Sequence, residues 1–116
     1  MDGLDPAFRY AAMFAALGHE ARVRVVRLLL AAHPAGLVAG ELQQELGIPA
    51  STLSHHLDAL TREGLIAQRR EGKFLRYRAA AEGLRDLLGF LYAECCTRSR
   101  IVPLSALRRV GSPDHR

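Results

Sequence analysis

The most constraining feature of this chain is the segment over residues 40–78, which predicts two short helices followed by a β-hairpin. The first helix is expected over about residues 39–46 and ends at Gly47, a residue suited to the left-handed position that closes a helix. The second is expected over about residues 50–63 and ends at Gly64. A helix pair of this spacing with a basic hairpin behind it is typical of proteins that place one helix in the DNA major groove. The segment therefore predicts duplex DNA as a partner.

The hairpin is expected to have strands over about residues 65–70 and 73–78, with Glu71-Gly72 in the turn. Alternation places residues 69 and 71 on one face and residue 70 on the other, so only some basic side chains can reach phosphate. Contacts to phosphate supply affinity and salt dependence rather than sequence choice. The alternative is a solvated hairpin kept soluble by its charge. We predict phosphate contacts from Arg70, Lys73 and Arg76.

A helical wheel sorts residues 50–63 into two faces. Ser51, Thr52 and His55 lie near the end that usually meets base edges, so these side chains are predicted to read DNA. His55 and His56 are adjacent and project about 100° apart, which disfavours shared chelation of one ion. His56 is expected to be half-buried with a local hydrogen bond. The core face is Leu53, His56, Leu57 and Leu60, and the solvent face is Ser51, Thr52, His55, Asp58 and Arg62.

Three further helices and a short strand are expected around this segment, which gives a mainly α fold with a small hairpin. Apolar residues at helical spacing predict helices over about residues 5–17 and 80–96. Each helix has an apolar face that must be buried against another element or subunit. Such faces usually mark interfaces, so we predict a homodimer built on both segments. Leu37-Val38 should pair with the hairpin. A further helix should follow Gly18-His19, with Val23, Val26, Leu29 and Leu30 as its inward stripe and Arg22, Arg24 and Arg27 towards water.

Size and charge agree with a small DNA-binding domain. The chain has 116 residues, a net charge of +4 and a pI near 9.7, which favour one domain and an anionic partner. We expect the domain over residues 1–104 and a flexible tail over 105–116. Residues 1–30 lack the pattern of a signal peptide and no apolar run reaches the roughly 20 residues of a membrane span, so a cytoplasmic protein without membrane contact is expected. Its two cysteines are then expected to be thiols.

The sequence resembles the ArsR/SmtB family of winged-helix repressors over about residues 10–96. The matching pieces are LGHEARVRVVRLL at 17–29, GELQQELGIPASTLSHHLDALTREGLI at 40–66 and REGKFLRYR at 70–78. The run Ser54-His55-His56-Leu57 is similar to the recognition-helix pattern of the family. The resemblance implies a winged helix-turn-helix homodimer joined through its first and last helices, and a repressor that leaves its operator when an inducer binds. Together with the helical wheel and the basic hairpin, the resemblance assigns DNA contacts to Ser51, Thr52, Ser54, His55, Arg62, Arg70, Lys73 and Arg76.

The family has inducer sites at several positions, and this sequence distinguishes between them. One familiar site of the family is a cysteine cluster in the helix before the recognition helix, and it is absent here because residues 38–46 contain no Cys or His. Another is a His/Asp cluster along the last helix, and it is disfavoured because residues 80–96 contain no His. Cys95-Cys96 at the end of the last helix remain, a soft donor pair suited to trivalent arsenic or antimony, inorganic or methylated. Residues 97–116 contain no third cysteine. The third ligand of the arsenic or antimony atom must then be water or hydroxide, a small thiol, a thiolate of the other subunit or a carbon substituent.

Other readings of these cysteines stay open. Cys95 could pack in the dimer core, or the pair could sense oxidants, reactive sulfur or another soft metal. A protein–protein adaptor without DNA binding is a further alternative, although the basic hairpin argues against it. No histidine lies near the pair in the sequence and no phosphate-binding Gly-rich loop is found, so an enzyme is not expected. No cofactor is expected to be required.

Overall fold

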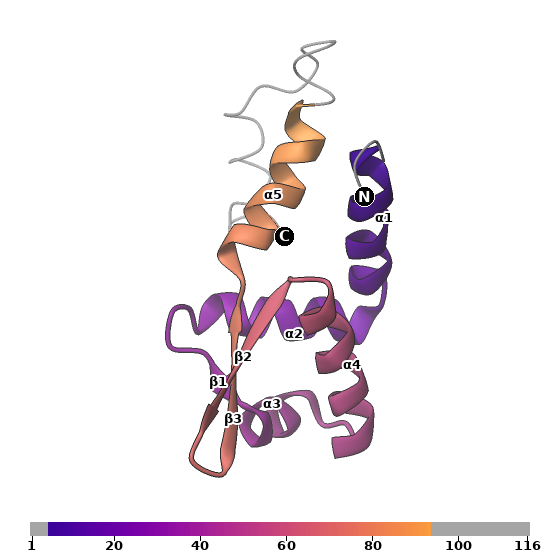
Figure 1. Ribbon diagram of the computed structural model, residues 1–116. Helices are drawn as coiled ribbons and strands as arrows, with labels where there is room; N and C mark the ends of the chain where they lie inside the picture. Colours follow the sequence, from indigo (N-terminus) through magenta and orange to yellow (C-terminus); the bar gives the residue numbers. More distant parts are fainter. Residues whose placement is uncertain (1–4, 94–116) are drawn as a thin grey trace, which may run out of the picture. The chain divides into compact units, whose positions relative to one another are not determined.

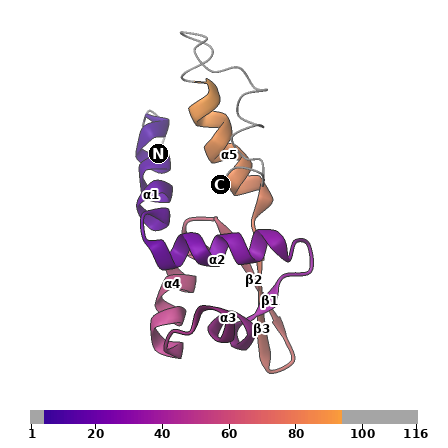
Figure 2. The same cartoon turned by 180° about the vertical axis from the view of Figure 1, so that it is seen from behind.

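The computed structural model describes residues 5–93, of which residues 5–84 belong to one compact unit and residues 85–93 to another. Figures 1 and 2 show that the first unit combines helices with a small antiparallel sheet. The predicted winged helix-turn-helix architecture is confirmed. The elements are α1 (Pro6–Leu17), α2 (Glu20–Ala31), β1 (Leu37–Val38), α3 (Ala39–Leu46), α4 (Ala50–Arg62), β2 (Ile66–Glu71), β3 (Phe74–Ala79) and α5 (Ala81–Tyr92).

The start of α1 and the start of α2 are each fixed by a local capping residue. The Asp5 carboxylate accepts a hydrogen bond from the amide of Ala7, and Pro6 occupies the first turn, where its missing N–H costs nothing. The chain turns at Gly18, and His19 Nδ1 then accepts from the amide of Ala21 at 3.3 Å. The predicted boundary between these two helices is therefore confirmed.

The buried face of α2 differs from the predicted stripe. Val25 and Leu29 are fully buried, whereas Val23 and Leu30 are 44% and 49% exposed. Val23 and Leu30 are seven residues apart and share one side of the helix, about 100° away from the side that packs on the core. The predicted stripe is therefore right for Val26 and Leu29, which are buried, and wrong for Val23 and Leu30.

The helix-turn-helix matches the prediction closely. Helix α3 ends at Gly47, which has a φ of +67° and donates its amide to the carbonyl of Gln43 at 2.8 Å. Helix α4 begins at Ala50, as expected, and ends one residue early, at Arg62. The predicted inward face of α4 is buried: Leu53, His56, Leu57 and Leu60.

The sheet has three strands in the order β1-β3-β2, so the wing expected from the hairpin gains a third strand. Leu37 pairs with Tyr77, which confirms the expected pairing of the short strand. The loop between β2 and β3 is Gly72-Lys73, with Gly72 at a φ of +62°. Both hairpin strands thus lie one residue later than predicted, because Glu71 still pairs with Phe74. Ile66, Tyr77 and Ala79 turn towards the core.

Helix α5 is described up to Tyr92, so the last part of the helix predicted over residues 80–96 lies outside the described residues. Leu88 is 65% exposed and Leu91 is 44% exposed. The predicted boundary between residues 104 and 105 also lies outside the described part. Among residues 5–93, no helix has the length and apolar character needed to cross a bilayer.

Candidate nucleic-acid interface

The predicted DNA-facing residues of α4 share the exposed side of that helix. Ser51, Thr52, Ser54 and His55 lie in its first half, Arg62 lies at its end, and all five are exposed. Figures 1 and 2 place the start of α4, helix α3 and the hairpin tip at one end of the first unit, opposite α2. A helix start beside a hairpin tip is the arrangement with which a winged helix approaches a duplex. The individual base and phosphate contacts stay predictions.

The opposite side of α4 is anchored through a histidine, in a way that the sequence did not predict. His56 is 5% exposed, and its Nδ1 accepts a hydrogen bond from Arg22 Nε of α2 at 3.0 Å. Arg22 Nη1 also donates to the carbonyl of Ala16 in α1 at 3.3 Å. Arg22 was expected to face water and His56 was expected to bond locally, and both expectations are wrong. The partners lie 34 residues apart in sequence, so no local pattern could connect them.

The charge environment of His56 favours the neutral ring. Burial lowers the pKa of His56, and the nearby His19, Arg22 and His55 lower it further. The rings of His19 and His56 have centroids 4.6 Å apart. Uncharged imidazole fits the geometry, because only an unprotonated Nδ1 can accept from Arg22.

The basic residues of the wing divide between two faces. Arg70 lies on the face of Ile66 and Tyr77, and Lys73 lies in the turn, and both are exposed. Arg76 lies on the other face, where its Nε donates to Glu71 at 2.8 Å and its Nη1 donates to the carbonyl of Gly36 at 3.3 Å. Arg70 and Lys73 can thus meet phosphate without breaking an ion pair, whereas Arg76 must first exchange Glu71 for a phosphate.

Glu71 is the acceptor for two guanidinium groups. Arg69 and Arg76 both form ion pairs with its carboxylate. Hydrogen bonds from Arg76 and then from Arg69 lower the pKa of Glu71, so the carboxylate is ionised at neutral pH. Phe74, paired with Glu71 at the base of the turn, is 56% exposed and was not singled out from the sequence. The wing therefore presents an aromatic ring as well as cations.

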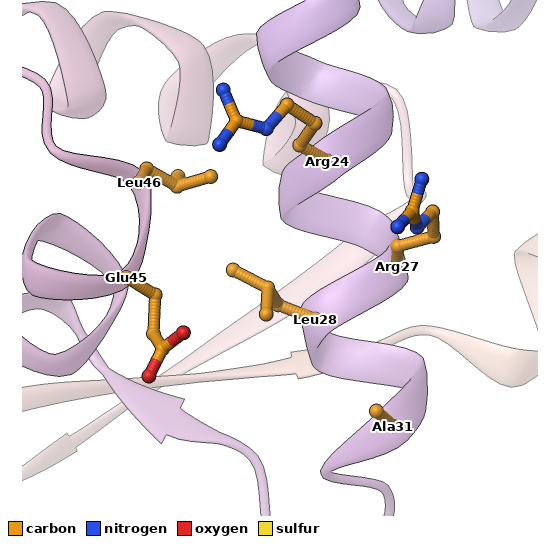
Figure 3. A pocket seen from close by; sticks show the side chains of 6 residues that line it. All are labelled: Arg24, Arg27, Leu28, Ala31, Glu45 and Leu46. Carbon is orange, nitrogen blue, oxygen red and sulfur yellow. The ribbon is translucent and has the colours of Figure 1, made fainter.

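Two cavities flank these elements, and neither resembles a metal centre. One of about 330 Å³ lies between α2 and α3 and is lined by no predicted DNA contact. Figure 3 shows Leu28 pointing from α2 towards Leu46 and Glu45 of α3. A smaller one of about 150 Å³ lies between α3, α4 and β3, with Ser54 and Tyr77 in its wall. Residues 5–93 contain no group of three candidate metal ligands, and Cys95 and Cys96 lie outside the described residues.

This geometry defines a winged helix-turn-helix DNA-binding protein. A family model described as "Helix-turn-helix domain" matches residues 17–69. The chain is 34% identical over 111 residues to an uncharacterised HTH-type transcriptional regulator of Mycobacterium tuberculosis, covering 93% of this chain and 96% of that protein. It belongs to the ArsR-like family of winged helix-turn-helix transcriptional regulators.

Other relatives agree with this assignment. A putative arsenical resistance operon repressor of Halobacterium salinarum is 34% identical over 73 residues, covering 61% of this chain and 54% of that protein. The structure of an ArsR-like transcriptional regulator from Rhodococcus sp. RHA1 superposes with a TM-score of 0.72 at 25% identity, covering 95% and 99% of the two chains. The homodimeric winged helix-turn-helix DNA-binding domain of a possible ArsR-family regulator from Mycobacterium bovis gives a TM-score of 0.62 at 25% identity, covering 82% and 92%.

Proposed function

We propose that this regulator is a homodimeric repressor that leaves its operator when trivalent arsenic or antimony binds Cys95 and Cys96. The observation that carries the proposal is the position of the cysteines. Both lie beyond α5, and the whole DNA-binding unit contains none. The proposed inducer ligands are therefore separate in the sequence from every residue assigned to DNA.

The chemistry of the pair selects the class of inducer. Thiolates are soft donors that prefer soft ions over hard ones, so trivalent arsenic and antimony fit better than magnesium or calcium. Two thiolates leave one arsenic valence for water, a small thiol, the partner subunit or a carbon substituent. We therefore expect a methylated or other organic trivalent arsenical to act at least as well as arsenite.

The proposed release acts through the dimer. Two recognition helices read half-sites about one DNA turn apart, so a change in their spacing weakens operator binding. The Mycobacterium bovis neighbour is a homodimeric DNA-binding domain, and the Halobacterium salinarum relative is named for arsenical resistance. These similarities support a homodimeric repressor of this kind.

On the DNA side, we propose that α4 reads the operator and the wing holds phosphate. Ser51, Thr52, Ser54 and His55 would meet base edges or the adjacent backbone, with Arg62 on phosphate. In the wing, Arg70 and Lys73 would meet phosphate directly, and Arg76 after it leaves Glu71. The exposure of these side chains supports the roles of α4, Arg70 and Lys73.

The test is release of the purified protein from its own promoter DNA by arsenite, antimonite, methylarsenite and an oxidant. Cys95→Ser, Cys96→Ser and the double variant should bind DNA normally and resist release by the arsenicals and antimonite, because a Ser oxygen replaces a soft donor poorly. Release of wild type by the oxidant alone would favour redox sensing by the same pair. Full release of the double variant by the same compounds would show that the cysteines are structural.

A further inference from the structure

A hydrogen-bonded bridge joins the back of α4 to α2 and α1, and its central donor is one guanidinium group. Arg22 donates from Nε to His56 Nδ1 and from Nη1 to the carbonyl of Ala16. We infer that Arg22 and His56 are positioning residues, which hold α4 in the orientation for operator reading and which release that orientation in acid. The inference rests on the proposed role of α4 as the reading helix, and is independent of the inducer.

His56 is well placed to control the reading face. It lies in the middle of α4, directly after His55, and the two rings have centroids 5.9 Å apart. His56 is buried on the core side while His55 is exposed on the predicted DNA side. Because α4 is one continuous helix, a shift at His56 would tilt or rotate the side that carries Thr52 and His55.

The bridge depends on an uncharged imidazole. Nδ1 of His56 accepts from Arg22, and a protonated ring has no lone pair on that atom. Protonation would therefore place an N–H and a positive charge against a guanidinium that cannot lose its own proton. Beside the bridge, His19 Nδ1 accepts a hydrogen bond from the amide of Ala21 at the start of α2.

The groups that act on His56 all disfavour its charged form. Burial has the largest effect on its pKa, and His19, Arg22 and His55 all lower it further. No carboxylate of the described residues is among the groups that shift it. The elements packed on α4 carry further charged or titratable side chains, none of which is among the groups that shift this pKa: Asp5 at the N-cap of α1, Arg9 and Tyr10 of α1, Glu20, Arg24 and Arg27 of α2, and Arg69, Arg70 and Glu71 of β2.

The direction of the effect follows from these charges. The folded pKa of His56 lies below its ordinary value of 6.5, so the bridge is intact above that pH and opens as the pH falls towards the lowered value. Opening the bridge should weaken operator binding. Binding to unrelated duplex should persist, because the phosphate contacts assigned to the wing do not depend on the bridge. Acid is therefore expected to reduce selectivity rather than total DNA binding.

The experiment measures the ratio of affinities for an operator duplex and a scrambled duplex, from about pH 8 to about pH 4.5. The range extends below that of ordinary histidine titration, because the pKa of His56 is lowered. The operator is selected from a random pool by wild type at neutral pH. Wild type should lose selectivity several-fold across this range. His56→Asn keeps an acceptor near the Nδ1 position without titrating, so it should remain selective throughout. Arg22→Met should be poorly selective at every pH.

His33→Asn is the matched control, since His33 lies in the turn after α2, away from the bridge, and should leave the profile unchanged. Circular dichroism of each variant reports folding. If Arg22→Met fails to fold, the comparison of His56→Asn with wild type still tests whether His56 causes the loss of selectivity in acid. An equal acid loss in His56→Asn, or a selectivity of wild type that does not change with pH, would overturn the positioning role. A wild type without selectivity at any pH would instead contradict operator reading by α4.

Discussion

Glu71 on β2 accepts a hydrogen bond from Arg76 Nε on β3 at 2.8 Å, and this ion pair restrains one cation of the wing. Arg69 and Arg76 lie directly opposite each other on the two strands, a like-charge pair that would be unfavourable alone. The Glu71 carboxylate between them neutralises part of that repulsion. The free wing is therefore less positive than its arginine content suggests.

Replacing Glu71 with Gln should strengthen binding to any duplex and steepen its salt dependence. The change removes a negative charge near phosphate and frees Arg69 and Arg76 to form additional contacts, each adding about one unit to the salt slope. Fluorescence anisotropy with random duplex over a salt series measures both quantities. Glu45→Gln is the control, because that exposed residue of α3 makes the same charge change away from the wing. Equal gains in both variants would argue against a specific role for Glu71.

Substitutions in α4 and at the wing tip should have different signatures. Thr52→Ala or His55→Ala should reduce discrimination between operator and mismatched sites by about 1–3 kcal/mol per lost base contact. Lys73→Ala should weaken binding to all sequences and reduce the salt slope by about one unit. Competition binding with operator and scrambled duplexes separates these effects, and Arg24→Ala controls for a change in net charge. If Lys73→Ala and His55→Ala gave the same pattern, the assigned division between α4 and wing would be wrong.

Gly36 should not tolerate a side chain, whereas Gly40 should. Gly36 has a φ of +79°, and a Cβ there would overlap the carbonyl oxygen of Tyr77 and the side chain of Arg78. Gly36→Ala should therefore lower the free energy of unfolding by about 2 kcal/mol or more. Gly40 lies in the first turn of α3, and a Cβ added there would meet no atom within 4 Å. Gly40→Ala should stabilise by up to about 1 kcal/mol, and urea unfolding of both variants checks the contrast.

The exposed apolar residues of α1 predict that it forms an interface. Phe8 is 70% exposed and Phe14 is 41% exposed, on a helix whose other side buries Met13. Sedimentation should give a dimer at micromolar concentration, and Phe14→Glu should give a monomer because a carboxylate would be buried without a partner. Leu30→Glu, on the exposed apolar side of α2, should remain dimeric. A wild-type monomer at this concentration would contradict the predicted dimer.

The sequence alone determined those features that depend on local rules. The period of α4 predicted the burial of Leu53 and Leu60 and the exposure of Thr52 and His55, because a helix presents the same side every three or four residues. Gly47 and Gly64 predicted the two helix ends, since both take the left-handed backbone that glycine adopts without strain. The helix pair and the basic hairpin behind it then predicted the wing and the class of partner, and the likeness to a known family agrees with both.

Only the tertiary structure decided which residues meet across long separations. Val25 rather than Val23 is buried because the sheet and helices cover one of the two apolar sides of α2. Arg22 faces His56 rather than water because α2 packs on α4, and Arg76 is paired because hairpin register places it beside Glu71. Local periodicity carries no information about which side of a helix its neighbours will cover. Ion pairs and buried hydrogen bonds depend on that choice, so they emerge only when the chain is folded.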